Sequence, residues 1–331
     1  MGEGEETKTR EEPKVEIQER GEIFFFYRPK VNHDEAHSVD EVQRLYIVLR
    51  PESGEREEEE KQSSDSGKEG AFNKSETTEE AQQESHADDE KEEEKKKEGG
   101  KGIEKVNIVK KPLMRFIVMG RKSLPDTSKR SRPYWGFVEI VTTKPEDIKK
   151  ALSEEQYETA TRGTRVKPAA RPLAEGVYRI LRHYPTSEGK GKAMHTHLVY
   201  KLELPLPEEK HEPQDSMNVE PEGSLIIQIK NPEQAAPPNA GLQSKRKATF
   251  PAHLQGQIGS HRFVAADPPD FLNYEGCEFI LISASDNIDA ELGLDVKPED
   301  MTDENYKSCS DLVNMFGEIS SIKPLIEGTW A

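Results

Sequence analysis

Two histidines in the second half of the chain are spaced so that they could bind a metal ion. His195 and His197 are two residues apart in an apolar segment, so in a strand both imidazoles point to one face, and Glu203 has the same parity. His183, which ends the preceding apolar segment, adds a third nitrogen if the two segments pair in the right register. Imidazole and carboxylate ligands suit first-row transition metals. The spacing therefore predicts a candidate divalent metal site, and the alternative is a set of strand histidines hydrogen-bonded to their neighbours.

The same stretch is similar to part of the first cupin motif. Gly189 and five further residues precede His195, as that motif requires, but Glu203 comes later than the motif places its carboxylate and the closing glycine is missing. A second cupin motif, with its further histidine, is not recognisable. The partial likeness implies a metal-dependent enzyme in a cupin-like barrel, which we keep as the alternative function.

A second candidate site is a basic loop that separates two apolar runs within residues 115–141. Five basic and two aromatic residues lie on or beside this loop: Arg121, Lys122, Lys129, Arg130, Arg132, Tyr134 and Trp135. Cations next to aromatic rings are what phosphate contact and base stacking require. The alternative is a solvated turn whose aromatic residues begin the next strand and pack inward. The loop predicts contact with a polyanion or with a protein partner.

Nucleophilic catalysis has less support in the sequence. A proline-rich stretch carries His253, His261, Asp267 and Asp270 and leads to Cys277, which begins an apolar run where a buried cysteine is the ordinary outcome. The serines of the ISAS string lack the flanking glycines of a nucleophile elbow. The sequence contains no P-loop, dinucleotide fingerprint, HExxH or paired CxxC motif. We therefore expect a non-catalytic protein without a cofactor.

Composition indicates that only part of the chain folds. Of its 331 residues 34% are charged and 32% hydrophobic, which is poor in apolar material for one compact body. Residues 52–105 contain 20 acidic and 10 basic residues, so this segment contributes −10 of the net charge of −17. Such a segment cannot bury enough apolar surface to offset the entropy of ordering it. We expect a disordered acidic insertion over residues 52–111 and a disordered tail over residues 1–20.

The expected cellular location follows from what the sequence lacks. It has no apolar leader and no run of eighteen apolar residues, and its two cysteines are too few for a disulfide framework. These features predict a soluble cytoplasmic or nuclear protein that is neither secreted nor membrane-spanning. The oligomeric state is left open.

Short apolar runs bounded by Gly, Pro or Asn supply the elements that must position these candidates. They predict about eight strands: EIFFFYRP, RLYIVLRP, RFIVMG, YWGFVEIVTT, GVYRILRH, THLVYKLELP, SLIIQIKNP and CEFILISAS. With the acidic insertion removed, RLYIVLRP and RFIVMG become neighbours in an antiparallel hairpin. Cap and breaker residues predict short helices within residues 142–152, 286–293 and 304–316.

The predicted fold class is a β-rich α+β unit made of antiparallel sheets or a barrel-like sandwich with a few short helices. This unit comprises residues 21–51 and 112–331. A stretch rich in Pro, Gly and basic residues leaves open a subdomain boundary near residues 155–172.

Eight strings along the chain are specific in combination. They are RGEIFFFYRPKV, VQRLYIVLRP, GRKSLPD, PYWGFVEIVT, EGVYRILRH, HTHLVYKLELP, PEGSLIIQIKNP and ADPPDFLNYEGCEFILISAS. Together they resemble a family of uncharacterised proteins from plants and bacteria, and the resemblance covers residues 21–331 apart from the acidic insertion. It implies one folded unit with a variable insertion and brings no known chemistry. The function we expect is a non-catalytic binding or scaffold module.

Overall fold

The computed structural model describes residues 4–52, 59–62, 103–106, 113–129, 132–161, 163–184, 194–206, 211–235, 246–298 and 310–331. The chain divides into two compact units, one formed by residues 1–53 and 112–331 and the other by residues 54–111. In the second unit, β4 (Glu59–Gln62) pairs antiparallel with β5 (Ile103–Val106). Apart from these strands and Glu52, the predicted disordered insertion over residues 52–111 lies outside the described residues.

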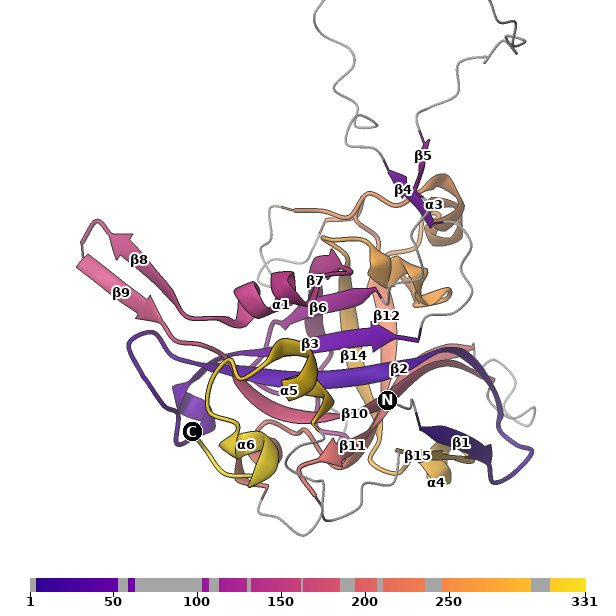
Figure 1. Cartoon of the computed structure of the whole chain (residues 1–331). Helices are drawn as coiled ribbons and strands as arrows, with labels where there is room; N and C mark the ends of the chain where they lie inside the picture. Colours follow the sequence, from indigo (N-terminus) through magenta and orange to yellow (C-terminus); the bar gives the residue numbers. More distant parts are fainter. Residues whose placement is uncertain are drawn as a thin grey trace, which may run out of the picture. The chain divides into compact units, whose positions relative to one another are not determined.

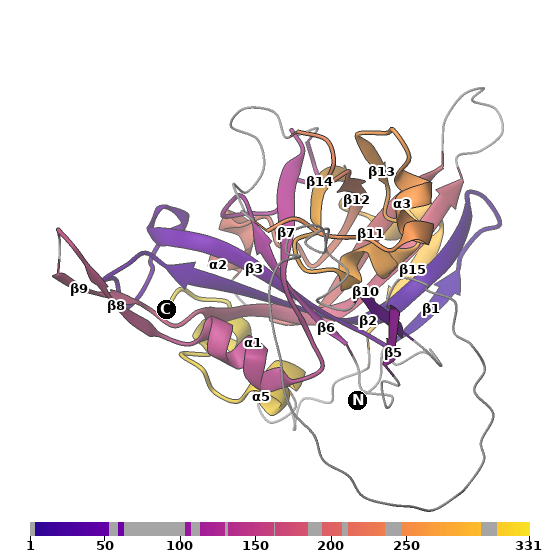
Figure 2. The same cartoon turned by 90° about the horizontal axis from the view of Figure 1, so that it is seen from above.

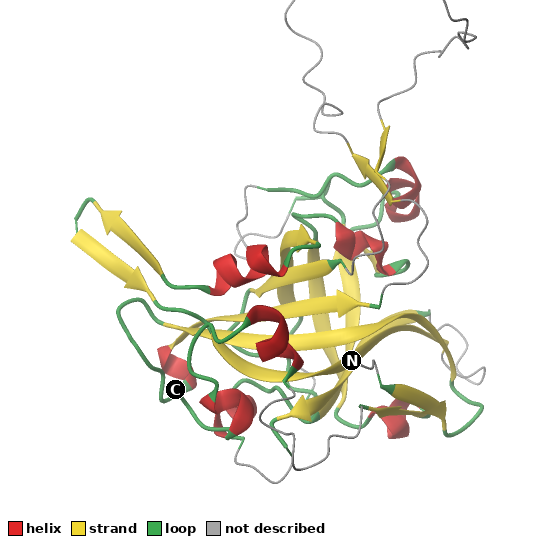
Figure 3. Cartoon of the chain, viewed as in Figure 1, coloured by secondary structure: helices red, strands yellow, loops and turns green. Residues whose placement is uncertain are grey.

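The first unit is built on an antiparallel barrel of eight strands, visible in Figures 1 and 3. In order around the barrel they are β11 (His195–Leu204), β10 (Arg171–Tyr184), β2 (Lys14–Pro29), β3 (Val42–Pro51), β6 (Met114–Met119), β7 (Tyr134–Thr142), β14 (Glu278–Ser285) and β12 (Glu222–Lys230). Pairing of β11 with β12 closes the ring, and β13 (Phe263–Ala265) adds to β12. The predicted β-rich fold class and the predicted pairing of β3 with β6 are confirmed.

The two-residue period of the strands places alternate side chains inside and outside the barrel. On β2, Phe25 and Tyr27 join the inner core, whereas Phe24 and Phe26 join a separate outer cluster. The phenylalanine run is therefore buried on both faces. Inside, Phe25 meets Tyr200 of β11 edge-to-face, with ring centroids 5.3 Å apart. Large side chains from opposite strands thus meet within the barrel.

Two groups of elements cover the outer wall of the barrel, as Figures 1 and 2 show. One group is α1 (Pro145–Leu152), α5 (Asp311–Phe316) and α6 (Lys323–Ile326). The other is α4 (Ile288–Leu292) with a small sheet of β1 (Glu5–Lys8) and β15 (Leu294–Lys297). The remaining elements are η1 (Val39–Glu41), β8 (Glu155–Thr159), β9 (Gly163–Lys167), α2 (Glu212–Ser216), α3 (Ala252–Ile258) and η2 (Pro269–Asn273).

A two-stranded arm, formed by β8 and β9, projects from this wall (Figure 1). Buried Arg28 binds both roots of the arm, the segments at Ser153 and Pro168 that join it to the barrel. Its guanidinium donates to the carbonyl oxygens of Ala151 at 2.7 Å and Ser153 at 3.1 Å, and also to that of Pro168. The first two carbonyls end α1, where the helix dipole favours a cation. One side chain therefore fixes both the helix and the arm.

Two predicted boundaries differ from the structure. The sequence predicts disorder over residues 1–20, whereas β1 and the first part of β2 lie there. β1 forms without an apolar run because it pairs with β15, far along the chain. Residues 155–172 are not a subdomain boundary, since β8, β9 and the start of β10 occupy them within one unit. Among the described residues, no helix has the length and apolar character needed to cross a membrane.

A buried ion pair links β2 to β6 across β3. Nη1 and Nη2 of Arg115 donate to the two carboxylate oxygens of Glu19 at 2.6 and 2.8 Å, and the two side chains are 0% and 6% exposed. The hydroxyl of Tyr178 also donates to Glu19 at 2.8 Å, and Nε of Arg115 donates to Asn273 at 2.9 Å. Both desolvated charges are therefore matched by close hydrogen bonds.

We predict that Arg115→Met lowers the free energy of unfolding by about 3 to 5 kcal/mol, because it leaves the Glu19 carboxylate buried without a cation. Urea unfolding followed by circular dichroism measures the loss. The double variant Glu19→Gln with Arg115→Met removes both charges and should recover part of it. A loss below about 1 kcal/mol in Arg115→Met, the range of an exposed pair, would contradict this description.

Candidate functional site

Three histidines gather on the outer wall of the barrel where β10 and β11 pair. His183 is the register partner of His195, and His197 lies on the same face of β11. The ring centroids of His183 and His197 are 5.1 Å apart, and that of His195 lies 6.4 Å from each. The structure therefore brings together the three histidines that the sequence places on one face.

His197 lies in the middle of a buried hydrogen-bond chain. Its Nε2 is 3.3 Å from Nδ1 of His183, and its Nδ1 is 2.9 Å from Oγ of Ser224 on β12. Ser224 in turn is hydrogen-bonded to Glu291 of α4, whose carboxylate is 3.9 Å from Nδ1 of His197. Donation in one direction, from His183 through His197 and Ser224 to Glu291, gives each of these contacts one donor and one acceptor. Among the described residues, Oε2 of Glu291 is buried and has no hydrogen-bond partner.

The order of the residues in this hydrogen-bond chain does not suit hydrolysis. In a catalytic triad the imidazole lies between the acid and the hydroxyl nucleophile. Here Ser224 lies between His197 and Glu291, and Ser224 is 0% exposed. A substrate cannot reach this hydroxyl, so the network supports the barrel wall and its contact with α4.

The histidines also do not form a ready metal site. Glu203 is six residues beyond His197, about 20 Å along a strand, so it takes no part in the cluster. The carboxylate near the histidines is Glu291, which register and α4 bring there and which no local spacing indicates. In the described part of the chain, no group of three or more His, Cys, Asp or Glu side chains is placed to hold a metal ion. The geometry favours hydrogen-bonded strand histidines.

The predicted basic loop is a folded turn in which two of its lysines interact with groups of the protein itself. Nζ of Lys122 donates to the carbonyl oxygens of Val39 at 3.3 Å and Asp40 at 3.1 Å. Lys129, on the surface, pairs with Asp126 of the same loop at 3.0 Å. The loop is therefore less basic toward a ligand than its sequence indicates.

The aromatic residues of the loop do not share one surface. Arg121 lies 5.7 Å from the ring centroid of Tyr134, whereas Trp135 packs against β13. Consecutive strand residues point to opposite faces, so Tyr134 and Trp135 cannot form one stacking platform. Arg132 is exposed and interacts with neighbouring groups, and Arg130 lies outside the described residues.

The third candidate, around Cys277, is closed to solvent. Cys277 is 0% exposed, and burial raises the pKa of its thiol. Asp267 is held by Arg182, whose Nε and Nη2 donate to its carboxylate at 2.6 and 2.7 Å. A reactive cysteine needs an accessible thiolate, which this environment disfavours.

A groove of about 960 Å³ lies outside the barrel between α1 and the outer faces of β3, β6 and β7. Its apolar floor includes Tyr46, Phe116, Val118 and Ile140, and the rings of the first two stack with centroids 5.1 Å apart. Six carboxylates and four cations also line it. The sequence does not indicate this site, because its residues come from three strands, a helix, the arm and two loops and share no local motif.

Comparison with known proteins adds no chemistry to this geometry. The chain matches no protein-family model, and no curated protein or solved structure matches it. A functional assignment therefore depends on the geometry of the candidate sites.

Burial, with smaller effects of His183 and His195, lowers the pKa of His197 from 6.5 to about 3. Between these values the unfolded chain binds a proton that the folded protein excludes, so the stability present above pH 6.5 is lost as pH falls through this window. We predict that the free energy of unfolding of His197→Gln falls less than that of the wild type as pH drops through this window. The difference between the two proteins should be on the order of 3 to 4 kcal/mol. Urea unfolding at several pH values measures it.

The matched control is His253→Gln on α3, where the histidine is exposed. This variant should keep the pH dependence of the wild type. Identical slopes of unfolding free energy against pH in the wild type and in His197→Gln would contradict the burial of a neutral imidazole.

Proposed function

We propose that the protein is a non-catalytic binding module whose partner is a polypeptide that docks in the groove beside α1. The observation that carries the proposal is an aromatic floor surrounded by charges of both signs. Apolar pockets of this kind take an anchor side chain, and a polar rim then sets orientation.

The walls of the groove are fixed before a partner arrives. Arg28 donates to Ala151 at the end of α1 and to Ser153 at the root of the arm, and both acceptor residues line the groove. Nε of Arg28 also donates to the hydroxyl of Tyr46, on the floor, at 3.1 Å. A preorganised site loses less conformational entropy on binding.

The rim charges favour a polypeptide over a nucleic acid. Among the four cations, Lys167 pairs with Glu155 at 3.3 Å and Arg246 pairs with Glu275 at 2.7 Å. Phosphate groups would meet six carboxylates here, whereas sites for polyanions are basic. A polypeptide with charges of both signs can complement this rim.

The arm offers the same partner a second contact. On β9, Val166 exchanges hydrogen bonds with Asn32 at 2.9 and 3.0 Å, so its polar backbone groups point away from β8. Register then points the backbone groups of Gln156 and Glu158 to the outer edge of β8, where an extended segment can pair. Tyr157 between them is 36% exposed, the one exposed large hydrophobic side chain among the described residues.

Peptides selected from a displayed library against the full chain test this function. We predict that selected peptides bind Val118→Asp at least about tenfold more weakly than the wild type, because a carboxylate would enter an apolar contact. Glu154→Lys, on the exposed rim, should also change their affinity. Fluorescence anisotropy measures binding, and melting curves check the fold.

His253→Asp on α3, outside the groove, is the matched control and should bind as the wild type does. Selected peptides that bind Val118→Asp and the wild type equally would show that the groove is not their site. Binding of single-stranded nucleic acid that is lost in Arg121→Glu would favour the basic loop instead.

A further inference from the structure

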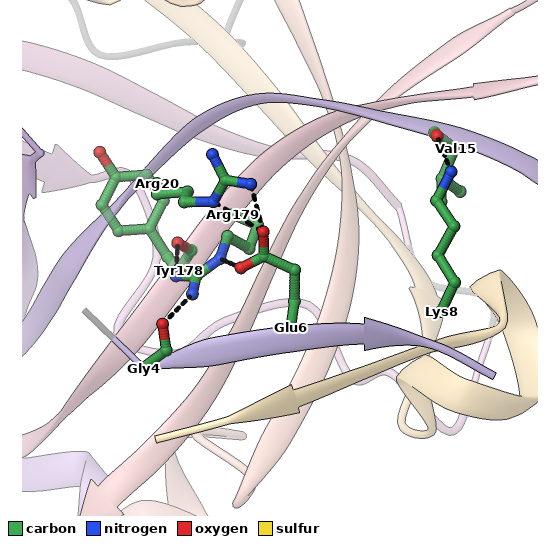
Figure 4. A network of polar contacts seen from close by, with 7 residues as sticks. All are labelled: Gly4, Glu6, Lys8, Val15, Arg20, Tyr178 and Arg179. Carbon is green, nitrogen blue, oxygen red and sulfur yellow. Dashed lines mark hydrogen bonds and ion pairs between the residues drawn. The ribbon is translucent and has the colours of Figure 1, made fainter. Parts of the chain in front are cut away.

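One partly buried side chain anchors the N-terminal strand β1 to the barrel wall. β1 pairs with β15 over four residues, from Glu5 opposite Lys297 to Lys8 opposite Leu294. In the described ranges β15 has no other strand partner. The side chains of β1 are exposed apart from that of Glu6, which reaches between two arginines in Figure 4.

The two arginines place two positive charges close together on the outer wall, which favours an anion between them. Arg179 of β10 and Arg20 of β2 are register partners on adjacent strands, and Arg179 is 0% exposed. Like charges opposite one another destabilise a sheet. The carboxylate of Glu6 accepts from Nε of Arg179 at 2.8 Å and from Nε of Arg20 at 2.7 Å. It therefore compensates both cations.

The ionised state of Glu6 fits this position. Burial raises the pKa of its carboxyl, but the hydrogen bonds and charges of Arg20 and Arg179 outweigh that effect and bring the pKa below its ordinary value. The carboxylate is therefore charged at neutral pH, as a bridge between two guanidinium groups requires.

The residue type is also restricted at Gly4, two positions before this carboxylate. The carbonyl oxygen of Gly4 accepts from Nη2 of Arg179 at 3.1 Å. Gly4 has φ +61°, and a Cβ there would lie 2.2 Å from the carbonyl oxygen of Lys297. Only glycine fits two positions before the carboxylate. The wall thus selects an extended segment with the pattern Gly-x-Glu.

We propose that β15, Arg20 and Arg179 form a binding site for an extended acidic segment of another polypeptide, and that residues 4–8 occupy this site in cis. The partner segment exchanges with β1, pairs with the edge of β15 and places its carboxylate between the arginines. Addition of a strand with a specific side-chain anchor is an established mode of peptide recognition. The cis segment supplies buried Arg179 with a carboxylate when the partner is absent, in addition to the carbonyl oxygen of Tyr178, to which Nη1 of Arg179 donates at 2.8 Å.

The form of the site separates a polypeptide from other anions. A free anion or a nucleic acid could approach the two guanidinium groups, but neither would use the backbone edge of β15 or the contact that Gly4 makes. The site also lies apart from the groove of the proposed function, since β1 and β15 cover β10 and β11 whereas the groove lies on β3, β6 and β7. The two proposals therefore stand or fall separately.

The test uses the full chain and a labelled peptide with the sequence of residues 4–10, GEETKTR. In Glu6→Gln the cis segment loses its charged anchor, so the peptide should bind this variant at least about tenfold more tightly than the wild type by fluorescence anisotropy. Glu5→Gln makes the same change at the neighbouring exposed carboxylate and should bind as the wild type does. A peptide with Gln in the place of Glu6 should bind none of the three chains.

Hydrogen exchange checks that β1 is released while the barrel stays folded: in Glu6→Gln, amides of β15 should exchange faster and those of β10 should not. If Glu6→Gln fails to fold, Lys8→Gly weakens β1 more mildly by removing the bond from Lys8 to the carbonyl of Val15, 3.2 Å long. Absence of peptide binding to a folded variant with released β1 would overturn the proposal. Equal binding of the Glu6 peptide and the Gln-containing peptide to that variant would also overturn it, because the carboxylate would then not be the anchor.

Discussion

The pairing of β11 with β12 is the constraint on which the rest of the structure depends. It joins residues 197–201 to residues 222–226 and turns a row of antiparallel strands into a barrel. Closure directs one face of every strand into the core, so the other face must be covered from outside or left for a ligand. α1, α5 and α6 cover one part of that wall, and α4, β1 and β15 cover another. Both proposed binding sites lie on this outer wall.

Buried arginines connect the wall to segments far away in the sequence. Arg28, Arg115 and Arg179 are all 0% exposed, but their partners differ. Arg28 uses carbonyl oxygens at the end of α1 and at the roots of the arm, and Arg115 uses the carboxylate of Glu19. Arg179 uses a carboxylate from the N-terminal strand. A buried guanidinium without such a partner is costly, so each arginine fixes the segment that serves it.

The elements that could be predicted from the sequence are those with a local apolar pattern. All eight barrel strands coincide with apolar runs in the sequence, and β3 and β6 pair as expected once the insertion is removed. β1, β8, β9 and β15 could not be predicted, because polar strands form only where a distant or neighbouring strand supplies hydrogen bonds. A strand that is buried by the core shows an apolar pattern in the sequence. A polar strand that depends on hydrogen bonds from another strand shows no such pattern.

The same distinction applies to the sites. Spacing placed His195 and His197 on one face, but Glu291 and Ser224 reach them only through strand register and the docking of α4. Charge in the basic loop could be counted in the sequence, but not the use of Lys122 within the fold. The groove and the arginine pair each combine several distant segments, so neither has a signature in the sequence.

Both proposals place the ligand on the outer wall of a barrel whose interior is occupied by its own side chains. Methyl chemical-shift mapping, during titration with a peptide selected against the full chain, tests this placement most directly. We expect shifts for Val118 and Ile140 on the groove floor and none for Ile23 and Ile227 in the inner core. Shifts confined to the inner core, with an unchanged groove, would contradict it.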